Sequence, residues 1–152
     1  NPVIAVDLDG GKLEWARRFG ADVVINSVKC EVGREVRKYV PRGTDVAVEA
    51  VGVAASLKDA MASLRKGGSL TLIGNLAASA DFPLQSMVTR EISVFGSCAS
   101  RGEYPTCLDL IGRRVVDVDA MISATPPLAE GATWFQRLYR GEAGLMKVVL
   151  LP

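Results

Sequence analysis

Short apolar runs rich in β-branched residues alternate along the chain with stretches of helical periodicity. The apolar runs predict strands at residues 3–7, 22–26, 45–52, 69–74 and 91–97. The stretches between them predict helices at residues 12–20, 31–40 and 56–68. The runs at residues 45–52 and 69–74 are almost continuously apolar, which is typical of strands covered on both faces. The alternation therefore predicts an α/β fold with a doubly wound, mainly parallel sheet.

The alternation changes after Gly96. The remaining pattern predicts a helix at 104–115 with Leu108 and Ile111 facing inward, an extended segment at 121–128, an amphipathic helix at 128–141 and a closing strand at 146–152. This tail has no strand–helix–strand unit of its own. We therefore expect one domain over residues 1–98 and a C-terminal α/β segment over 99–152 that packs on a domain preceding Asn1.

Composition and charge argue against several classes of function. The 152 residues are 49% hydrophobic and 23% charged, as in a globular protein. Eighteen Lys and Arg residues and 17 Asp and Glu residues give a net charge of +1 without a long block of like charge, so nucleic-acid binding is not expected. No run predicts a membrane span or a signal peptide. Three cysteines without C-x-x-C spacing and no histidine predict a cytoplasmic chain without a zinc site of its own.

Asp7 ends the first predicted strand and opens the loop before a helix. In dinucleotide-binding folds an acid at the end of the second strand accepts hydrogen bonds from the adenosine ribose, roughly 20 residues after a glycine-rich turn. A carboxylate there would repel the 2′-phosphate of NADP, so Asp7 in this role predicts NAD as the coenzyme. The alternative is a turn or helix-capping residue, and no glycine-rich turn precedes Asp7.

Five segments together resemble the C-terminal half of a medium-chain, zinc-dependent alcohol or polyol dehydrogenase of the sorbitol dehydrogenase type. They are VIAVDLDGGKLEWARRFGADVVIN, GTDVAVEAVG, LRKGGSLTLIG, REISVFGS and KVVLLP. The resemblance implies a Rossmann-type NAD-binding domain in an oxidoreductase that transfers a hydride between a secondary alcohol or polyol and NAD. It also implies that the zinc ligands lie in a catalytic domain missing from this chain, so the chain alone is expected to be truncated and inactive.

The resemblance assigns coenzyme contacts to the ends of the predicted strands, and no catalytic residue to this chain. Asp7 and Lys12 would bind the adenosine ribose. The other expected contacts are Ala50, Val51 and Gly52 at the adenosine, Ile73, Gly74 and Asn75 at the nicotinamide end, Ser97, Cys98 and Ala99 at the carboxamide, and Lys147 at the pyrophosphate. The alternative for each is structural: strand-end packing, a turn glycine or a surface lysine.

Two structural expectations follow from this interpretation. The first Rossmann strand and its glycine-rich loop are missing, and because that strand is central in the order 3-2-1-4-5-6, its loss should leave a gap in the sheet. Glu49 is the only charge in the stretch AVEAV, which should be buried. An unpaired buried carboxylate is costly, so Glu49 should have a partner or lie at a mouth of the sheet.

Two other classes of function remain alternatives to a dehydrogenase. A methyltransferase-like domain would bind S-adenosylmethionine beside the same acid, and a non-catalytic nucleotide-binding or interaction domain would do no chemistry. For a dehydrogenase, we expect a small alcohol or polyol as substrate and a homodimer or homotetramer. Residues 91–97 could supply an edge strand for that assembly.

Overall fold

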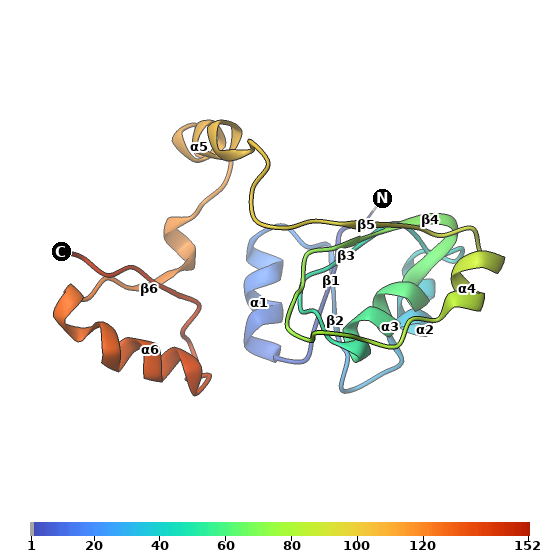
Figure 1. The fold of residues 1–152 in the computed structure, drawn as a ribbon, viewed down its shortest axis with the longest axis horizontal. Coiled ribbons are helices and arrows are strands. Elements are labelled where there is room, and N and C mark those ends of the chain that lie inside the picture. The colour runs from blue at the N-terminus through green and yellow to red at the C-terminus, as the bar shows by residue number, and fades with distance from the viewer. Residues whose placement is uncertain (1) are drawn as a thin grey trace. The chain divides into compact units, whose positions relative to one another are not determined.

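The computed structural model describes residues 2–152, which divide into two compact units, residues 2–99 and residues 100–152. Figure 1 shows strands and helices alternating along the first unit. Each unit is described by itself. Among the described residues, no helix combines the length and apolar character that a membrane crossing requires.

The first unit begins with a pair of parallel strands, β1 (Ile4–Asp7) and β2 (Val23–Asn26). Helix α1 (Gly10–Arg18) joins them and starts at Asp9, whose side chain accepts hydrogen bonds from the first-turn backbone. Helix α2 (Val32–Tyr39) follows β2. The predictions of the β1 and β2 strands and of the α1 and α2 helices are confirmed, with bounds that differ by one or two residues at most ends.

The same unit continues with three parallel strands in the order β3 (Thr44–Glu49), β4 (Leu64–Leu72) and β5 (Ser93–Gly96). Helix α3 (Ala54–Ser63) connects β3 to β4, and the short helix α4 (Leu84–Thr89) precedes β5. Within residues 2–152, this sheet shares no strand pairing with the β1–β2 sheet. The predicted α/β fold with a gap in its parallel sheet is therefore confirmed.

The predicted end of the α3 helix is wrong. The sequence pattern continues the helix through residues 64–68, but the chain becomes extended at Leu64 and enters β4. Side chains from elsewhere satisfy the carbonyls at this junction: Arg90 donates to the carbonyls of Met61 and Leu64, and the Thr44 hydroxyl donates to that of Ser63. Because these tertiary bonds replace further helical bonds, the helix can end without leaving its last carbonyls unpaired.

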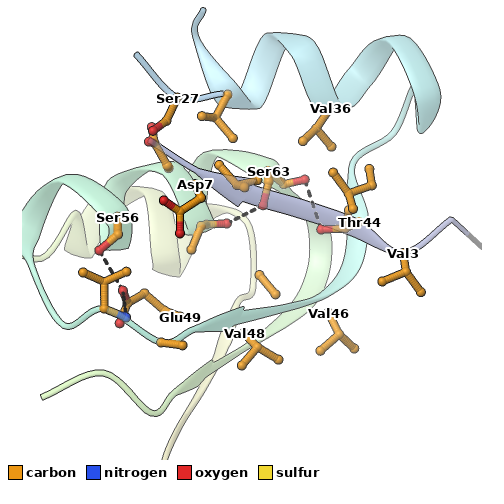
Figure 2. Close-up of a pocket in the computed structure, with 18 of the residues that line it drawn as sticks. Val3, Asp7, Ser27, Val36, Thr44, Val46, Val48, Glu49, Ser56 and Ser63 are labelled. Carbon is orange, nitrogen blue, oxygen red and sulfur yellow. Dashed lines mark hydrogen bonds between the residues drawn. The ribbon is translucent and has the colours of Figure 1, made fainter. Parts of the chain in front are cut away.

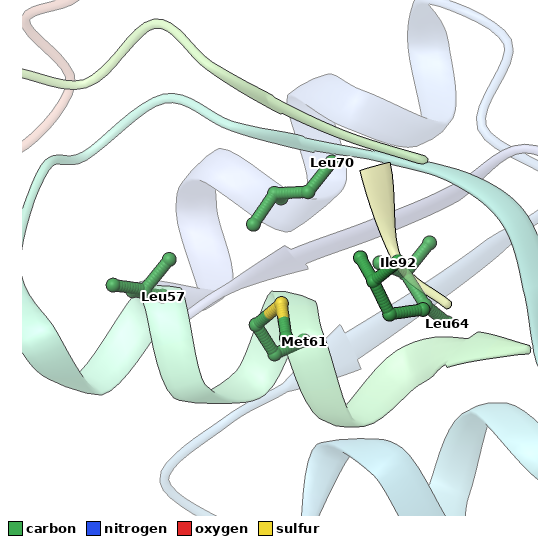
Figure 3. Packing of buried hydrophobic residues seen from close by; sticks show 5 residues of the cluster. All are labelled: Leu57, Met61, Leu64, Leu70 and Ile92. Atoms are coloured by element: carbon green, nitrogen blue, oxygen red, sulfur yellow. The ribbon is translucent and has the colours of Figure 1, made fainter. Parts of the chain in front are cut away.

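Two apolar clusters hold the first unit together. The larger one contains Leu57 and Met61 of α3, Leu64 and Leu70 of β4, and Ile92, and Figure 3 shows these five side chains packed together. Leu64 and Leu70 are completely buried. The smaller cluster joins Ile25, Val32 and Val36 beneath the β1–β2 pair. In these clusters α2 packs on the first sheet and α3 on the second, and α1 also contacts both β1 and β2.

Residues 100–152 form helix α5 (Tyr104–Gly112), strands β6 (Ile122–Ala124) and β7 (Lys147–Val148), and helix α6 (Gly131–Tyr139), with 3₁₀ turns η1 (Asp119–Met121) and η2 (Leu128–Glu130). The two strands pair in parallel. Leu108 and Ile111 of α5 are 64% and 37% exposed within this unit. Their expected inward face, on a domain that precedes Asn1, stays a prediction.

Candidate functional site

The carboxyl ends of β1 and β3 open into one groove of about 1150 Å³. Figure 2 shows Asp7 and Glu49 toward the end of this groove that lies away from Val3. Asp7 is half-buried, and its Oδ1 accepts a hydrogen bond of 2.9 Å from the backbone N–H of Asp9. This local turn holds the Asp7 carboxylate at the strand end while it still lines the groove.

Glu49 is a buried carboxylate whose hydrogen-bond donors lie in the loop that follows it and in the first turn of α3. Its Oε1 accepts hydrogen bonds of 2.9 Å from the backbone N–H groups of Val51 and Gly52, and of 2.7 Å from the Ser56 hydroxyl. Burial raises the pKa of Glu49, but the hydrogen bonds from Gly52, Ser56 and Val51 outweigh it and hold the pKa below its usual range. The expectation of a partner for this charge is confirmed, and the carboxylate fixes the β3–α3 loop.

The backbone on either side of Glu49 brings two of the predicted segments into contact. The Glu49 carbonyl accepts hydrogen bonds from the N–H groups of Ile73 (2.8 Å) and Gly74 (3.0 Å) after β4. A Cβ at Gly74 would lie 2.1 Å from the Gly52 nitrogen, so the two loops touch through backbone atoms alone. This close approach requires glycine at residue 74 and puts residues 50–52 against residues 73–75.

The predicted residues after β5 lie at the same edge of the three-stranded sheet. The N–H of Ser97 donates a hydrogen bond of 2.9 Å to the carbonyl of Leu72, the last residue of β4. Cys98 is exposed, and Ala99 adopts a left-handed backbone conformation with φ of +50°. This segment thus turns sharply as it leaves the sheet, one strand beyond the loop that contains Gly74.

A family model described as zinc-binding dehydrogenase matches residues 2–113. The chain belongs to the zinc-binding dehydrogenase family. Sorbitol dehydrogenase from Bacillus subtilis (strain 168) is 28% identical over 153 residues, which are 99% of this chain and 43% of that protein. The resemblance to part of an alcohol or polyol dehydrogenase is therefore confirmed.

Solved structures give the same result. Alcohol dehydrogenase TADH from Thermus sp. ATN1 has a TM-score of 0.87 at 29% identity, covering 97% of this chain and 43% of that one. A zinc-binding dehydrogenase from Sinorhizobium meliloti 1021, in a structure bound to NADP, has a TM-score of 0.88 at 24% identity, covering 100% and 45%; that likeness concerns the fold alone. The chain spans less than half the length of these relatives.

In this zinc-binding dehydrogenase chain, most residues predicted for the coenzyme gather at one edge of the first unit. The groove is lined by Asp7, Lys12, Ala50 and Val51, while Gly52, Ile73, Gly74 and Asn75 form the adjoining loop contact. Lys147 opens β7 in the other unit, so its expected role at the pyrophosphate stays a prediction.

Sequence reasoning did not identify two polar residues of α3 that line the groove. Ser56 bonds Glu49, and Asp59 lies farther along the same helix. Burial raises the pKa of Asp59, with the charge of Lys58 opposing the rise and that of Glu31 adding to it. The available signal for Ser56 was a hydroxyl in the first turn of the helix that follows a buried acid. Nothing in the sequence distinguishes Asp59 from a solvent-facing helical acid.

Proposed function

We propose that this chain forms most of the coenzyme-binding part of an oxidoreductase that transfers a hydride between NAD and a secondary alcohol or polyol. The observation that carries the proposal is the position of Asp7, at the carboxyl end of β1 and in the same groove as the β3–α3 loop. In open parallel sheets, ligands bind in the crevice outside the carboxyl ends of the strands. Membership of the zinc-binding dehydrogenase family supports this function over that of a methyltransferase-like domain.

The residues at this edge suit a dinucleotide. Asp7 would accept hydrogen bonds from the adenosine ribose hydroxyls, with Lys12 beside it in the groove. Ala50, Val51 and the loop containing Gly74 would lie along the coenzyme, because glycine lets a ligand approach the backbone closely. When bound, the nicotinamide accepts or donates the hydride. Ser97, Cys98 and Ala99 would hold its carboxamide.

The proposal places the zinc ligands and the alcohol-binding chemistry in a catalytic domain outside this chain. Its support is that the chain covers only 43% of the sorbitol and alcohol dehydrogenase relatives. Among the described residues, no group of three or more His, Cys, Asp or Glu side chains is placed to hold a metal ion. Residues 99–152 would pack on that domain, and we propose a cytoplasmic dimer or tetramer in which the outer edge of β5 is available for pairing.

Replacing Asp7 tests the coenzyme assignment. In the protein that contains this chain, Asp7→Gly should weaken NAD binding by about tenfold or more and raise NADP affinity relative to NAD. NAD binding weakens because the ribose hydroxyls lose the acceptor that Asp7 would provide. NADP affinity rises relative to NAD because a carboxylate about 4 Å from a 2′-phosphate costs on the order of 1 to 4 kcal/mol. Titration calorimetry with each coenzyme measures the ratio of NAD affinity to NADP affinity.

An exposed acid of the same unit supplies a control. Asp81→Ala should leave both affinities unchanged, since Asp81 is exposed and does not line the groove. If Asp7→Gly leaves the ratio of NAD to NADP affinity at its wild-type value, Asp7 is not the ribose-binding acid. Binding of S-adenosylmethionine instead of NAD by the intact protein would overturn the proposed function.

A further inference from the structure

The loop that follows β1 contains Asp7, the acid on which the proposed function rests. Residues Asp7, Leu8 and Asp9 lead from β1 to α1. Asp7 and Asn26 are the last residues paired across β1 and β2. The side chain of Leu8 is 69% exposed, so packing does not hold it. The position of this loop therefore depends on its hydrogen bonds.

Two hydrogen bonds from the end of β2 hold the loop. The backbone N–H of Ser27 donates to the Asp7 carbonyl at 3.2 Å, which continues the main-chain pattern of the sheet. The next carbonyl, that of Leu8, accepts a hydrogen bond of 3.0 Å from Nδ2 of Asn26. A side chain thus continues the contact between the two strands where their main-chain pairing ends.

The side-chain amide of Asn26, which is half-buried, is held at both of its ends. Its Oδ1 accepts a hydrogen bond of 3.0 Å from the backbone N–H of Val28. A backbone N–H can only donate and a carbonyl can only accept, so these partners require oxygen on the Val28 side and nitrogen on the Leu8 side. The amide therefore has one orientation, in which it joins the loop after β1 to the turn after β2.

One peptide group connects Asn26 to the Asp7 carboxylate. The carbonyl of Leu8 and the N–H of Asp9 belong to the same peptide bond, which is planar, so holding one end orients the other. Asn26 holds the oxygen of this group at 3.0 Å, and the N–H donates to Oδ1 of Asp7 at 2.9 Å. The orientation of the Asp7 carboxylate is therefore fixed from β2, through Asn26.

The same peptide group also precedes the start of α1. The Asp9 side chain accepts hydrogen bonds from the N–H groups of Gly11 and Lys12 in the first turn. Among the hydrogen bonds of residues 2–152, the one from Asn26 is the only one that the Leu8 carbonyl accepts. Removing the Asn26 amide would therefore release this peptide group from β2, while the Ser27 bond to the Asp7 carbonyl would remain.

We propose that Asn26 is a positioning residue for the choice of coenzyme: its amide holds the peptide group between Leu8 and Asp9 and thereby directs the Asp7 carboxylate at the adenosine ribose. This inference rests on the proposed function, in which Asp7 binds that ribose. NAD binding needs the directed carboxylate, whereas the 2′-phosphate of NADP is repelled by it. Releasing the loop should therefore weaken NAD binding and leave NADP binding unchanged or stronger.

Coenzyme affinities of the protein that contains this chain test the proposal. Asn26→Ala should lower the ratio of NAD affinity to NADP affinity by about fivefold, measured by titration calorimetry. In an Asp7→Gly background the same substitution should change the ratio by less than about twofold, because the carboxylate through which Asn26 acts is gone. A merely structural residue would weaken both coenzymes by the same factor in both backgrounds, and that result would overturn the proposal.

Cys30→Ala is a matched control in the same turn. The Cys30 thiol donates a hydrogen bond of 3.5 Å to the main-chain carbonyl of Asn26 and packs against the smaller apolar cluster. Its removal takes a bond from Asn26 but leaves the bond to Leu8, so the ratio of affinities should stay within about twofold of wild type. Equal changes of the ratio in Asn26→Ala and Cys30→Ala would assign the effect to the turn as a whole and contradict the proposal.

Hydrogen exchange tests the positioning step without coenzyme. In the coenzyme-free protein, the amides of residues 9–12 should exchange about fivefold faster in Asn26→Ala than in Cys30→Ala, measured by mass spectrometry. Equal exchange in the two variants would show that Asn26 does not hold the loop, and would overturn the proposal. If Asp7→Gly lowers the affinity ratio and Asn26→Ala does not, this inference fails alone. If Asp7→Gly leaves the ratio at its wild-type value, the proposed function fails and this inference fails with it.

Discussion

Gly74→Ala should lower the free energy of unfolding of the first unit by about 2 to 3 kcal/mol. The added Cβ would lie 2.1 Å from the Gly52 nitrogen and 2.4 Å from the Val51 carbonyl carbon. Both atoms are backbone, and Glu49 holds their loop with hydrogen bonds to Val51 and Gly52, so the loop cannot move aside cheaply. The same shift would displace residues 73–75 from the candidate coenzyme site.

Urea denaturation followed by tryptophan fluorescence measures this effect. Of the two tryptophans, Trp15 lies in the first unit and Trp134 in the second, so a Trp134→Phe background makes Trp15 the reporter for the first unit. Gly96→Ala is the matched control, because Gly96 ends the neighbouring strand β5 and a Cβ added there would have no atom within 4 Å. It should change stability by less than about 0.5 kcal/mol. A Gly74→Ala variant as stable as this control would refute the contact.

The strands and helices before residue 64 were predictable because local pattern and tertiary packing agree there. β1 and β2 are short β-branched runs, and α1 begins at an aspartate that caps it. The end of α3 was not predictable, because its last carbonyls are satisfied by Thr44 and Arg90, which are distant in sequence. Helical periodicity contains no information about hydrogen-bond donors that are distant in sequence.

In the candidate site too, contacts between residues close in sequence were predictable, and contacts that depend on tertiary packing were not. The partners of Glu49 lie within seven residues of it, so the need for a partner was visible in the sequence. The contact between Gly52 and Gly74 and the place of Asp59 in the groove depend on how β3, β4 and α3 pack, which the sequence does not state. The inward face expected for Leu108 stays a prediction, because the side chain is exposed within its own unit and the domain expected to cover it is not in this chain.

Glu49→Ala should cost the first unit about 3 kcal/mol or more at pH 7, because it strands the two backbone N–H groups of Val51 and Gly52 that now share one buried carboxylate. The Ser56 hydroxyl keeps the Val53 carbonyl as an acceptor. Glu49→Gln keeps one acceptor oxygen and should cost about 1 to 2 kcal/mol. Urea denaturation with Trp15 as reporter measures both, and Glu14→Gln, an exposed acid 3.9 Å from Arg17, should cost less than about 0.5 kcal/mol.

Wild type and the Glu49→Gln variant should also respond differently to pH. The pKa of Glu49 is raised by burial but lowered further by its hydrogen bonds, so in the folded chain it lies below the ordinary value. Such a group contributes its full stabilisation above the ordinary pKa of about 4.3 and loses it as the pH falls through the folded value. The stability difference between wild type and Glu49→Gln should therefore be constant from about pH 7 to pH 5 and shrink below about pH 4. A difference that stays constant down to about pH 3 would mean that the carboxylate charge does not hold this loop, and that the Gly52–Gly74 contact is maintained by packing alone.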